Sequence, residues 1–261
     1  MNKKLAISGV VQGVGFRPFI YQLALRHNLN GYIVNNTSGV DVEVEGSEDS
    51  ILLFMDALKN ELPPLARIDS LESLPGEYKG YSSFQIQHSE TLDSKSALVS
   101  PDIAICNNCL KEMNDPNNRR YNYPFINCTD CGPRYSIMKT LPYDRPHTSM
   151  QRFDMCKTCY NEYSDALDRR FHAQPISCHE CGPKLILRST DGKELANDKD
   201  ALTLTADAIK QGHIVAVKGL GGFHLICDAT NSKAVEKLRQ RKGRLVKPFA
   251  VMFPDIDMLK N

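Results

Sequence analysis

The 261-residue sequence has little net charge and no long apolar segment. Its 32 Lys and Arg residues nearly balance 31 Asp and Glu residues, and a formal charge of +1 gives no overall field to attract nucleic acid or an anionic membrane. No apolar run approaches the roughly 18 to 20 residues that cross a bilayer. The N-terminal apolar run resembles a signal peptide, but Gln12 and Arg17 interrupt it and no small-residue cleavage site follows. We therefore expect a cytoplasmic protein without a membrane partner.

Cysteine, by contrast, is abundant and unevenly placed. Of nine cysteines, eight lie between Cys106 and Cys181 in four Cys-x-x-Cys pairs, and Cys227 stands apart. In a reducing cytosol such pairs more often bind metal or carry redox chemistry than form structural disulfides.

The paired cysteines belong to an internal repeat. Residues 106–137 align without gaps on residues 156–187, and 11 of the 32 positions are identical. Each copy reads Cys-x2-Cys-x18-Cys-x2-Cys, which supplies four thiolates and leaves no open coordination position, as in structural zinc sites. We predict two structural zinc ions, with ligation inside each repeat favoured over crossed ligation and with redox dithiols or a rubredoxin-like iron site as alternatives. The predicted ligands are Cys106, Cys109, Cys128, Cys131, Cys156, Cys159, Cys178 and Cys181.

The first 88 residues follow the order β-α-β-β-α-β. Apolar residues alternate with polar ones in the strands, most strictly over 40–45, and recur at helical spacing in the helices. Ser47 is suited to cap the second helix. This order predicts an antiparallel sheet with two helices on one face. The expected strands lie around 5–7, 32–35, 40–45 and 84–86, and the expected helices over 16–24 and 47–60.

A glycine-containing loop, Val11–Arg17, joins the first strand to the first helix. Gly13 and Gly15 allow the backbone N–H groups to turn toward one point, and the helix N-terminus and Arg17 add positive charge there. Phosphate is the natural ligand of such a loop, although a purely structural turn is equally common.

This loop, together with the segment 31–40 around Asn35, resembles the two signatures of the acylphosphatase family. The resemblance covers most of residues 1–88. It implies that Arg17 and the loop amides hold the phosphoryl oxygens, while Asn35 orients the attacking water. An acyl phosphate has a good leaving group, so positioning and charge stabilisation suffice without a metal or a covalent nucleophile. The implied phosphate-binding residues are Gln12, Gly13, Val14, Gly15 and Phe16.

The C-terminal segment offers a weaker signal. We expect a helix over 202–211, a buried strand over 214–217, a second helix over 232–241 and a strand over 249–253, after a linker at 188–200 that mirrors another at 89–100. The glycine turn at 218–222 and the cations of 241–247 are suited to a triphosphate, but a basic run is more often a solvated helix end.

The order of the three parts resembles the N-terminal part of the HypF-type carbamoyltransferases, which mature nickel–iron hydrogenases. The implied fold class is α+β: a ferredoxin-like split βαβ acylphosphatase domain (1–90), a tandem four-cysteine zinc module (101–188, with repeats 101–150 and 151–188) and a partial α/β YrdC-like nucleotide-binding domain (200–261). By this resemblance Lys242, Arg244 and Lys247 contact ATP.

The resemblance also implies a reaction sequence. Carbamoyl phosphate is hydrolysed to carbamate, ATP activates the carbamate as an adenylate, and the carbamoyl group passes to the C-terminal cysteine of the partner protein HypE. The YrdC-like part is short here and the transfer domain is absent, so we expect a truncated form or a fragment that keeps only acyl-phosphate hydrolysis.

The alternative is a zinc-ribbon module that binds nucleic acid or a protein, with an inactive N-terminal domain. Four arginines would carry such binding, but we favour a role in offsetting thiolate charge or capping carbonyls. Of the histidines, His179 is a spare zinc ligand at most, and His224 is a candidate for the glycine turn. The four arginines are Arg119, Arg120, Arg169 and Arg170.

Overall fold

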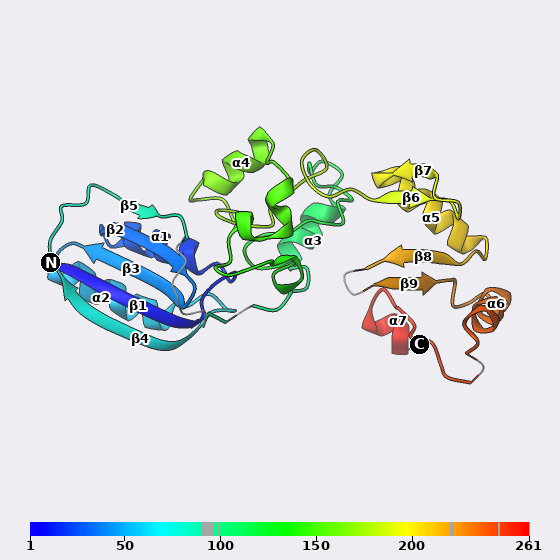
Figure 1. Ribbon diagram of the computed structural model, residues 1–261, viewed down its shortest axis with the longest axis horizontal. Helices are drawn as coiled ribbons and strands as arrows, with labels where there is room; N and C mark the ends of the chain where they lie inside the picture. The colour runs from blue at the N-terminus through cyan, green and yellow to red at the C-terminus, as the bar shows by residue number, and fades with distance from the viewer. Residues whose placement is uncertain (90–96, 99, 220–221, 245, 261) are drawn as a thin grey trace. The chain divides into compact units, whose positions relative to one another are not determined.

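A five-stranded sheet with two helices on one face forms the N-terminal part of the chain (Figure 1). The computed structural model describes residues 1–89, 97–98, 100–219, 222–244 and 246–260. The strand order is β4-β1-β3-β2-β5, with antiparallel pairing except between β2 and β5. The split βαβ arrangement expected from the sequence is confirmed. Its elements are β1 (Asn2–Val10), α1 (Phe16–Arg26), β2 (Asn30–Asn36), β3 (Gly39–Glu45), α2 (Glu48–Asn60), β4 (Arg67–Gly76) and β5 (Phe84–Ile86).

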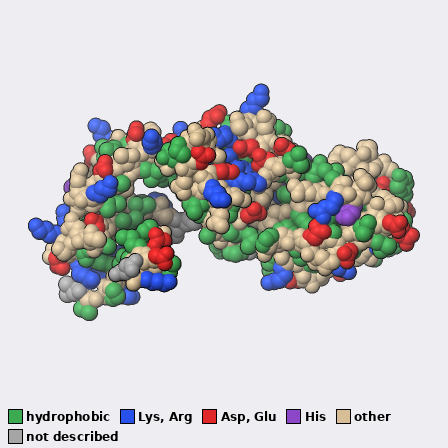
Figure 2. All heavy atoms as spheres, turned by 180° about the vertical axis from the view of Figure 1, so that it is seen from behind, with side chains coloured by type: hydrophobic (Ala, Val, Ile, Leu, Met, Phe, Trp, Pro, Cys, Tyr) green, Lys and Arg blue, Asp and Glu red, His purple; other side chains and the backbone are tan. Residues whose placement is uncertain are grey.

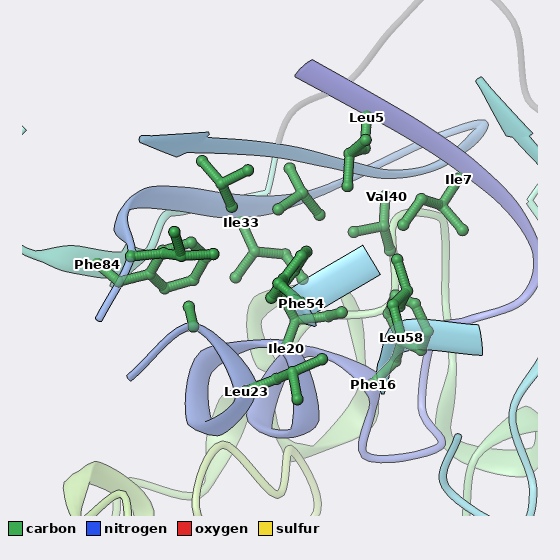
Figure 3. Packing of buried hydrophobic residues seen from close by; sticks show 14 of the residues in the cluster. Leu5, Ile7, Phe16, Ile20, Leu23, Ile33, Val40, Phe54, Leu58 and Phe84 are labelled. Atoms are coloured by element: carbon green, nitrogen blue, oxygen red, sulfur yellow. The ribbon is translucent and has the colours of Figure 1, made fainter. Parts of the chain in front are cut away.

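One core fills the space between this sheet and its helices (Figure 3). Leu5 and Ile33 from the sheet meet Ile20 of α1 and Phe54 of α2, and each is at most 2% exposed. Ser47 caps α2 by accepting a hydrogen bond from the Ser50 N–H at 3.1 Å, as its position predicted. This core fixes the end of β1 and the start of α1, and therefore the loop between them.

Strand β4 was not expected from the sequence. Ile68 and Leu71 both pack against the core although they are three positions apart, which breaks the two-residue period of a strand. A bulge explains the break, because Ser8 pairs with Ser70 whereas the next residue, Gly9, pairs with Ile68. An edge strand that is mostly exposed carries little hydrophobic pattern for a prediction to use.

The cysteine repeats fold into two small modules with little regular structure, which we call the finger module (residues 101–183). Each repeat starts with a short helix, α3 (Asn107–Asn114) or α4 (Lys157–Ser164), whose N-cap residue is the first cysteine of that repeat. Each has its own small cluster of buried residues around the cysteines. Three 3-10 turns lie between the last cysteine of the first repeat, Cys131, and the first cysteine of the second, Cys156, at Tyr135–Ile137, Arg145–His147 and Ser149–Arg152.

Contacts divide the chain into two units, Met1–Pro183 and Lys184–Asn261. In the second unit, α5 (Asp198–Lys210) and α6 (Ser232–Lys242) match the expected helices. The expected linker 188–200 instead holds most of a hairpin and the start of α5, and most of the other expected linker, 89–100, lies outside the described residues. The remaining elements are β6 (Ile186–Arg188), β7 (Glu194–Asn197), β8 (Val215–Lys218), β9 (Phe223–Ile226) and α7 (Ile256–Lys260).

Two expectations for the second unit are wrong. The strand expected at 249–253 has no regular structure, and β8 is largely exposed rather than buried. Strand β8 pairs with β9 in a two-stranded sheet, and two strands cover little apolar surface. Hydrophobic side chains consequently remain on the surface of this unit (Figure 2), among them Phe223 and Met252.

Candidate functional site

The loop between β1 and α1 presents free backbone N–H groups at a helix N-terminus. Gly13 and Gly15 have φ values of 73° and 75°, a left-handed conformation that glycine adopts without strain. No side chain caps α1, and its first turn contains no acidic residue. Within the described ranges, the N–H groups from Gly13 to Phe16 donate to no protein acceptor. Such an arrangement binds an anion.

Residues from outside the N-terminal domain hold this loop in place. The Ser100 hydroxyl donates to the Gln12 carbonyl oxygen at 2.6 Å, and the Arg134 Nε donates to the Gly13 carbonyl oxygen. In a trans peptide the C=O and the following N–H point in opposite directions. Holding these two carbonyls therefore directs the N–H groups of Gly13 and Val14 away from Ser100 and Arg134.

The two predicted catalytic side chains, Arg17 and Asn35, converge on one atom. Both are buried, and both donate to the main-chain carbonyl oxygen of Tyr143, at 3.4 Å from the Arg17 Nη2 and 3.2 Å from the Asn35 Nδ2. The Arg17 guanidinium also lies 3.6 Å from the Asp144 carboxylate. Because its Nδ2 is engaged, Asn35 has a defined amide orientation, and its buried Oδ1 has no partner among the described residues.

Gln12 connects the loop to both neighbours. Its side-chain Nε2 donates to the carbonyl oxygens of Asn36 and Gly39 at 2.7 Å, and its Oε1 accepts from the Tyr143 N–H at 2.8 Å. The side chain of Gln12 thus fixes Tyr143 relative to the turn between β2 and β3, whereas any contact with a phosphate would come from its backbone.

A small cavity of about 30 Å³ lies beside Arg17 and the loop. Sequence reasoning found one side of it and missed the other, because the remaining wall comes from the finger module, more than 100 residues away in the sequence. No local motif marks those residues, and only the fold brings them to the loop. The wall consists of Thr129, Arg134, Tyr143, His172, Ala173, Gln174 and Pro175.

Burial shifts the pKa of two ionisable groups that line the cavity. Burial, reinforced by the charge of Arg17, lowers the pKa of His172 from 6.5 to about 4, so this imidazole is neutral at neutral pH. Burial also raises the pKa of the Tyr143 phenol to about 12. With His172 neutral, the positive charge in the lining of the cavity comes from Arg17 and Arg134.

Each cysteine repeat gathers its own four sulfur atoms. The Sγ atoms of each set all lie within 4.8 Å of one another. The Cys106–Cys128 and Cys128–Cys131 Sγ distances are 3.7 and 3.8 Å, and the Cys178 Sγ lies 3.8 Å from that of Cys156 and 3.7 Å from that of Cys181. A tetrahedron with Zn–S bonds of about 2.3 Å has edges of about 3.8 Å. The sulfur positions therefore fit zinc, grouped within repeats rather than across them.

The four arginines cross between the repeats. Arg119 of the first repeat donates to the sulfur atoms of the second cluster, at 3.3 Å to Cys156, 3.4 Å to Cys159 and 3.0 Å to Cys178. Arg169 of the second repeat donates to the Cys109 Sγ of the first cluster at 3.3 and 3.2 Å. Each cluster thus has a cation from the other repeat beside its thiolates.

The neighbouring arginines cap carbonyls across the same boundary. Arg120 donates to the Ser177 carbonyl oxygen at 2.9 Å and pairs with Glu162, while Arg170 donates to the Asn127 carbonyl oxygen at 3.0 Å and pairs with Glu112. All four arginines are occupied within the module, which weighs against the nucleic-acid alternative. His179 contacts the Tyr121 carbonyl oxygen at 2.9 Å.

The predicted nucleotide-binding residues lie around the C-terminal end of α6 in the second unit. The Arg244 guanidinium stacks over the Phe249 ring at 5.5 Å, and Arg239 donates to the carbonyl oxygens of Arg244 and Lys247 at 3.1 Å. No contact in the described part joins the side chains of Lys242, Arg244 and Lys247, so their role stays a prediction. The His224 ring lies close to Gly219, at the start of the glycine turn, of which Leu220 and Gly221 lie outside the described residues.

Comparison with known proteins gives family matches to three consecutive parts of the chain. An Acylphosphatase family model matches residues 3–86, a HypF finger model matches residues 105–138 and 155–188, and a Telomere recombination model of the Sua5/YciO/YrdC type matches residues 207–261. An acylphosphatase of Mannheimia succiniciproducens is 40% identical over 85 residues, which cover 32% of this chain and 91% of that protein.

Two longer relatives match almost the whole chain. The carbamoyltransferase HypF of Synechocystis sp. is 52% identical over 257 residues, covering 98% of this chain and 33% of that protein. A crystal structure of full-length HypF in a phosphate- and nucleotide-bound form superposes with a TM-score of 0.90 at 46% identity, covering 99% of this chain and 34% of that one.

The fold and the site thus define an acylphosphatase-type domain joined to tandem four-cysteine fingers. The chain is HypF-like over almost its whole length and resembles the N-terminal part of HypF proteins. It spans about a third of the length of the HypF relatives that it matches. Among the described residues, no helix is both long and apolar enough to cross a membrane.

Proposed function

We propose that the chain is part of a carbamoyltransferase of nickel–iron hydrogenase maturation, and that its N-terminal domain hydrolyses carbamoyl phosphate. The observation that carries the hydrolysis is the convergence of Arg17 and Asn35 on the Tyr143 carbonyl oxygen, beside a loop whose N–H groups from Gly13 to Phe16 have no acceptor among the described residues. The match to HypF carbamoyltransferases supports the wider role.

The loop and Arg17 bind the phosphoryl group in this reaction, and Asn35 binds the attacking water. The N–H groups of Gln12 to Phe16 and the Arg17 guanidinium bind the phosphoryl oxygens and stabilise their charge in the transition state. The Asn35 Oδ1 accepts a hydrogen bond from the attacking water. A bond forms between the water oxygen and phosphorus, the bond from phosphorus to the acyl oxygen breaks, and carbamate leaves with inorganic phosphate as the other product.

The finger module has a structural part in this proposal. The eight paired cysteines would hold two zinc ions with all-thiolate ligation, which supplies folding energy and leaves no position for a substrate. ATP would bind at Lys242, Arg244 and Lys247 and activate the carbamate, and HypE would accept the carbamoyl group. Those later steps belong to the full-length enzyme.

The experiment is phosphate release from carbamoyl and acetyl phosphate by the full chain and by Arg17→Ala. We expect kcat to fall by about 10²- to 10³-fold, the usual cost of removing one transition-state donor. Arg26→Ala is the matched control, since Arg26 lies on the same helix and is exposed in an ion pair with Glu61. Equal rates for Arg17→Ala and the unsubstituted chain would refute the catalytic role.

A further inference from the structure

A cavity that could take the acyl group of a bound substrate lies beside the phosphate-binding loop. The loop amides and Arg17 hold the phosphoryl end, so the rest of the molecule points into the cavity beside them. The finger module, including Tyr143, His172 and Gln174, lines the far side of that cavity. The space left between loop and finger module therefore sets the size of the acyl group.

This wall is built from firmly held residues. The Tyr143 ring lies 3.4 Å from the place where a Cβ atom on Gly13 would stand, and Tyr143 is only 5% exposed. Arg134 donates to the carbonyl oxygens of Gly13, Cys128 and Cys131. Gln174 is 2% exposed; its Nε2 donates to the His172 carbonyl oxygen at 2.7 Å. Side chains with this many contacts do not swing aside freely.

The volume distinguishes small from large acyl groups. The cavity measures about 30 Å³, whereas a cavity that holds benzene in a protein interior measures roughly 150 Å³. A carbamoyl or acetyl group adds one heavy atom to the carbonyl carbon and fits a space of this order, but a phenyl ring does not.

We propose that the finger module makes this site selective for small acyl phosphates, with Tyr143 as the specificity-determining residue. This inference rests on the proposed hydrolase function and adds the substrate class. It gives the finger module a second role beside holding metal, because its fold supplies one wall of a site whose phosphate-binding half belongs to the N-terminal domain.

The test compares acetyl phosphate with benzoyl phosphate on the full chain. We expect kcat/KM for benzoyl phosphate to be at least about tenfold below that for acetyl phosphate, within the range by which a filled pocket rejects added bulk. Tyr143→Ala, which keeps the main-chain carbonyl that Arg17 and Asn35 contact, should raise the benzoyl-to-acetyl ratio by at least about tenfold.

Two further variants keep the test decisive. Tyr135→Ala is the matched control, because Tyr135 belongs to the same module and is 68% exposed, and it should leave the ratio unchanged. His172→Gly removes a second wall residue at a backbone φ of 53° that glycine accepts, and it should raise the ratio even if Tyr143→Ala folds poorly.

The outcomes separate the two proposals. If the unsubstituted chain hydrolyses both substrates equally well, the hydrolase function stands and the size selection is wrong. An unchanged ratio in both wall variants also overturns the selection. If neither substrate releases phosphate, the hydrolase function is wrong, and the size selection, which depends on it, is wrong as well.

Discussion

The crossed arginines of the finger module lead to a prediction about which metal centre each one supports. Replacing Arg119 with alanine removes a cation of the first repeat, yet its three sulfur contacts are all in the second cluster. We therefore expect zinc to be lost more easily from Cys156, Cys159, Cys178 and Cys181 than from the cluster of the repeat that carries the substitution.

The contacts set the magnitude. Hydrogen bonds to charged groups contribute about 1.5 kcal/mol or more each, so three of them give about 4 to 5 kcal/mol before screening. The Arg119 side chain is 30% exposed, and solvent screening at such a site removes about half of this value. The remaining 2 kcal/mol or so corresponds to roughly 30-fold in zinc affinity, within the 10- to 100-fold that ligand-supporting partners usually contribute.

Arg169 provides the matched comparison. It donates to a single sulfur atom, that of Cys109, so Arg169→Ala should weaken the first cluster by only about tenfold. Arg67→Ala, at an exposed ion pair with Asp69 in the N-terminal domain, should affect neither cluster.

The assay must resolve the two clusters. The zinc-loaded chain is challenged with increasing chelator, its freed cysteines are alkylated, and digestion with mass spectrometry reports alkylation at Cys109 and Cys159 separately. In Arg119→Ala we expect Cys159 to react at lower chelator concentration while Cys109 keeps its midpoint. Equal shifts at both clusters, or a shift at Cys109 alone, would show that the crossed contacts do not support the metal centres.

Two further predictions concern the N-terminal unit. Phe54→Ala should lower the free energy of unfolding of the N-terminal domain by about 3 to 5 kcal/mol, because Phe54 is 0% exposed in the core. Leu53→Ala, at a neighbour that is 58% exposed, should change it by less than about 0.5 kcal/mol. Hydrogen exchange of β1 and β3 in the full chain measures both, and equal exchange rates in the two variants would contradict the assigned core. Because the pKa of His172 falls from 6.5 to about 4 on folding, the native state favours the neutral imidazole, so its contribution to stability is complete above pH 6.5 and is lost as the pH falls toward 4. His172→Asn, which tolerates the same positive φ, should flatten the dependence of the denaturation midpoint on pH between 7.5 and 4.5, and an unchanged dependence would show that His172 titrates normally.

Local signals in the sequence predicted the parts of the fold that depend on neighbours in the chain. The loop at Gly13 and Gly15, the cap at Ser47 and the four-cysteine spacing each follow from a few adjacent residues. Strand β4 was not predicted because its bulge breaks the two-residue period of a strand. The strand predicted at 249–253 is absent because an apolar run alone does not supply a pairing partner.

The side chains of the candidate site could be predicted from local sequence patterns, but the residues from the finger module could not. Arg17 and Asn35 stand in recognisable local patterns, and the structure brings both to the Tyr143 carbonyl oxygen. Tyr143 itself was invisible to sequence reasoning, since a main-chain carbonyl has no sequence signature and its position depends on long-range packing.

The contacts that complete the proposed phosphate site join residues that are far apart in sequence and are therefore synthesised at different times. Arg134 contacts Gly13 across 121 residues, and the Tyr143 carbonyl meets Asn35 across 108. During synthesis the sheet and helices of the N-terminal domain leave the ribosome long before Arg134 and Tyr143 do, and domains generally fold in that order. A nascent chain therefore carries Arg17 and Asn35 on a finished sheet without the carbonyl on which they converge. The proposed catalytic constellation is therefore completed only after the first four-cysteine finger has been made.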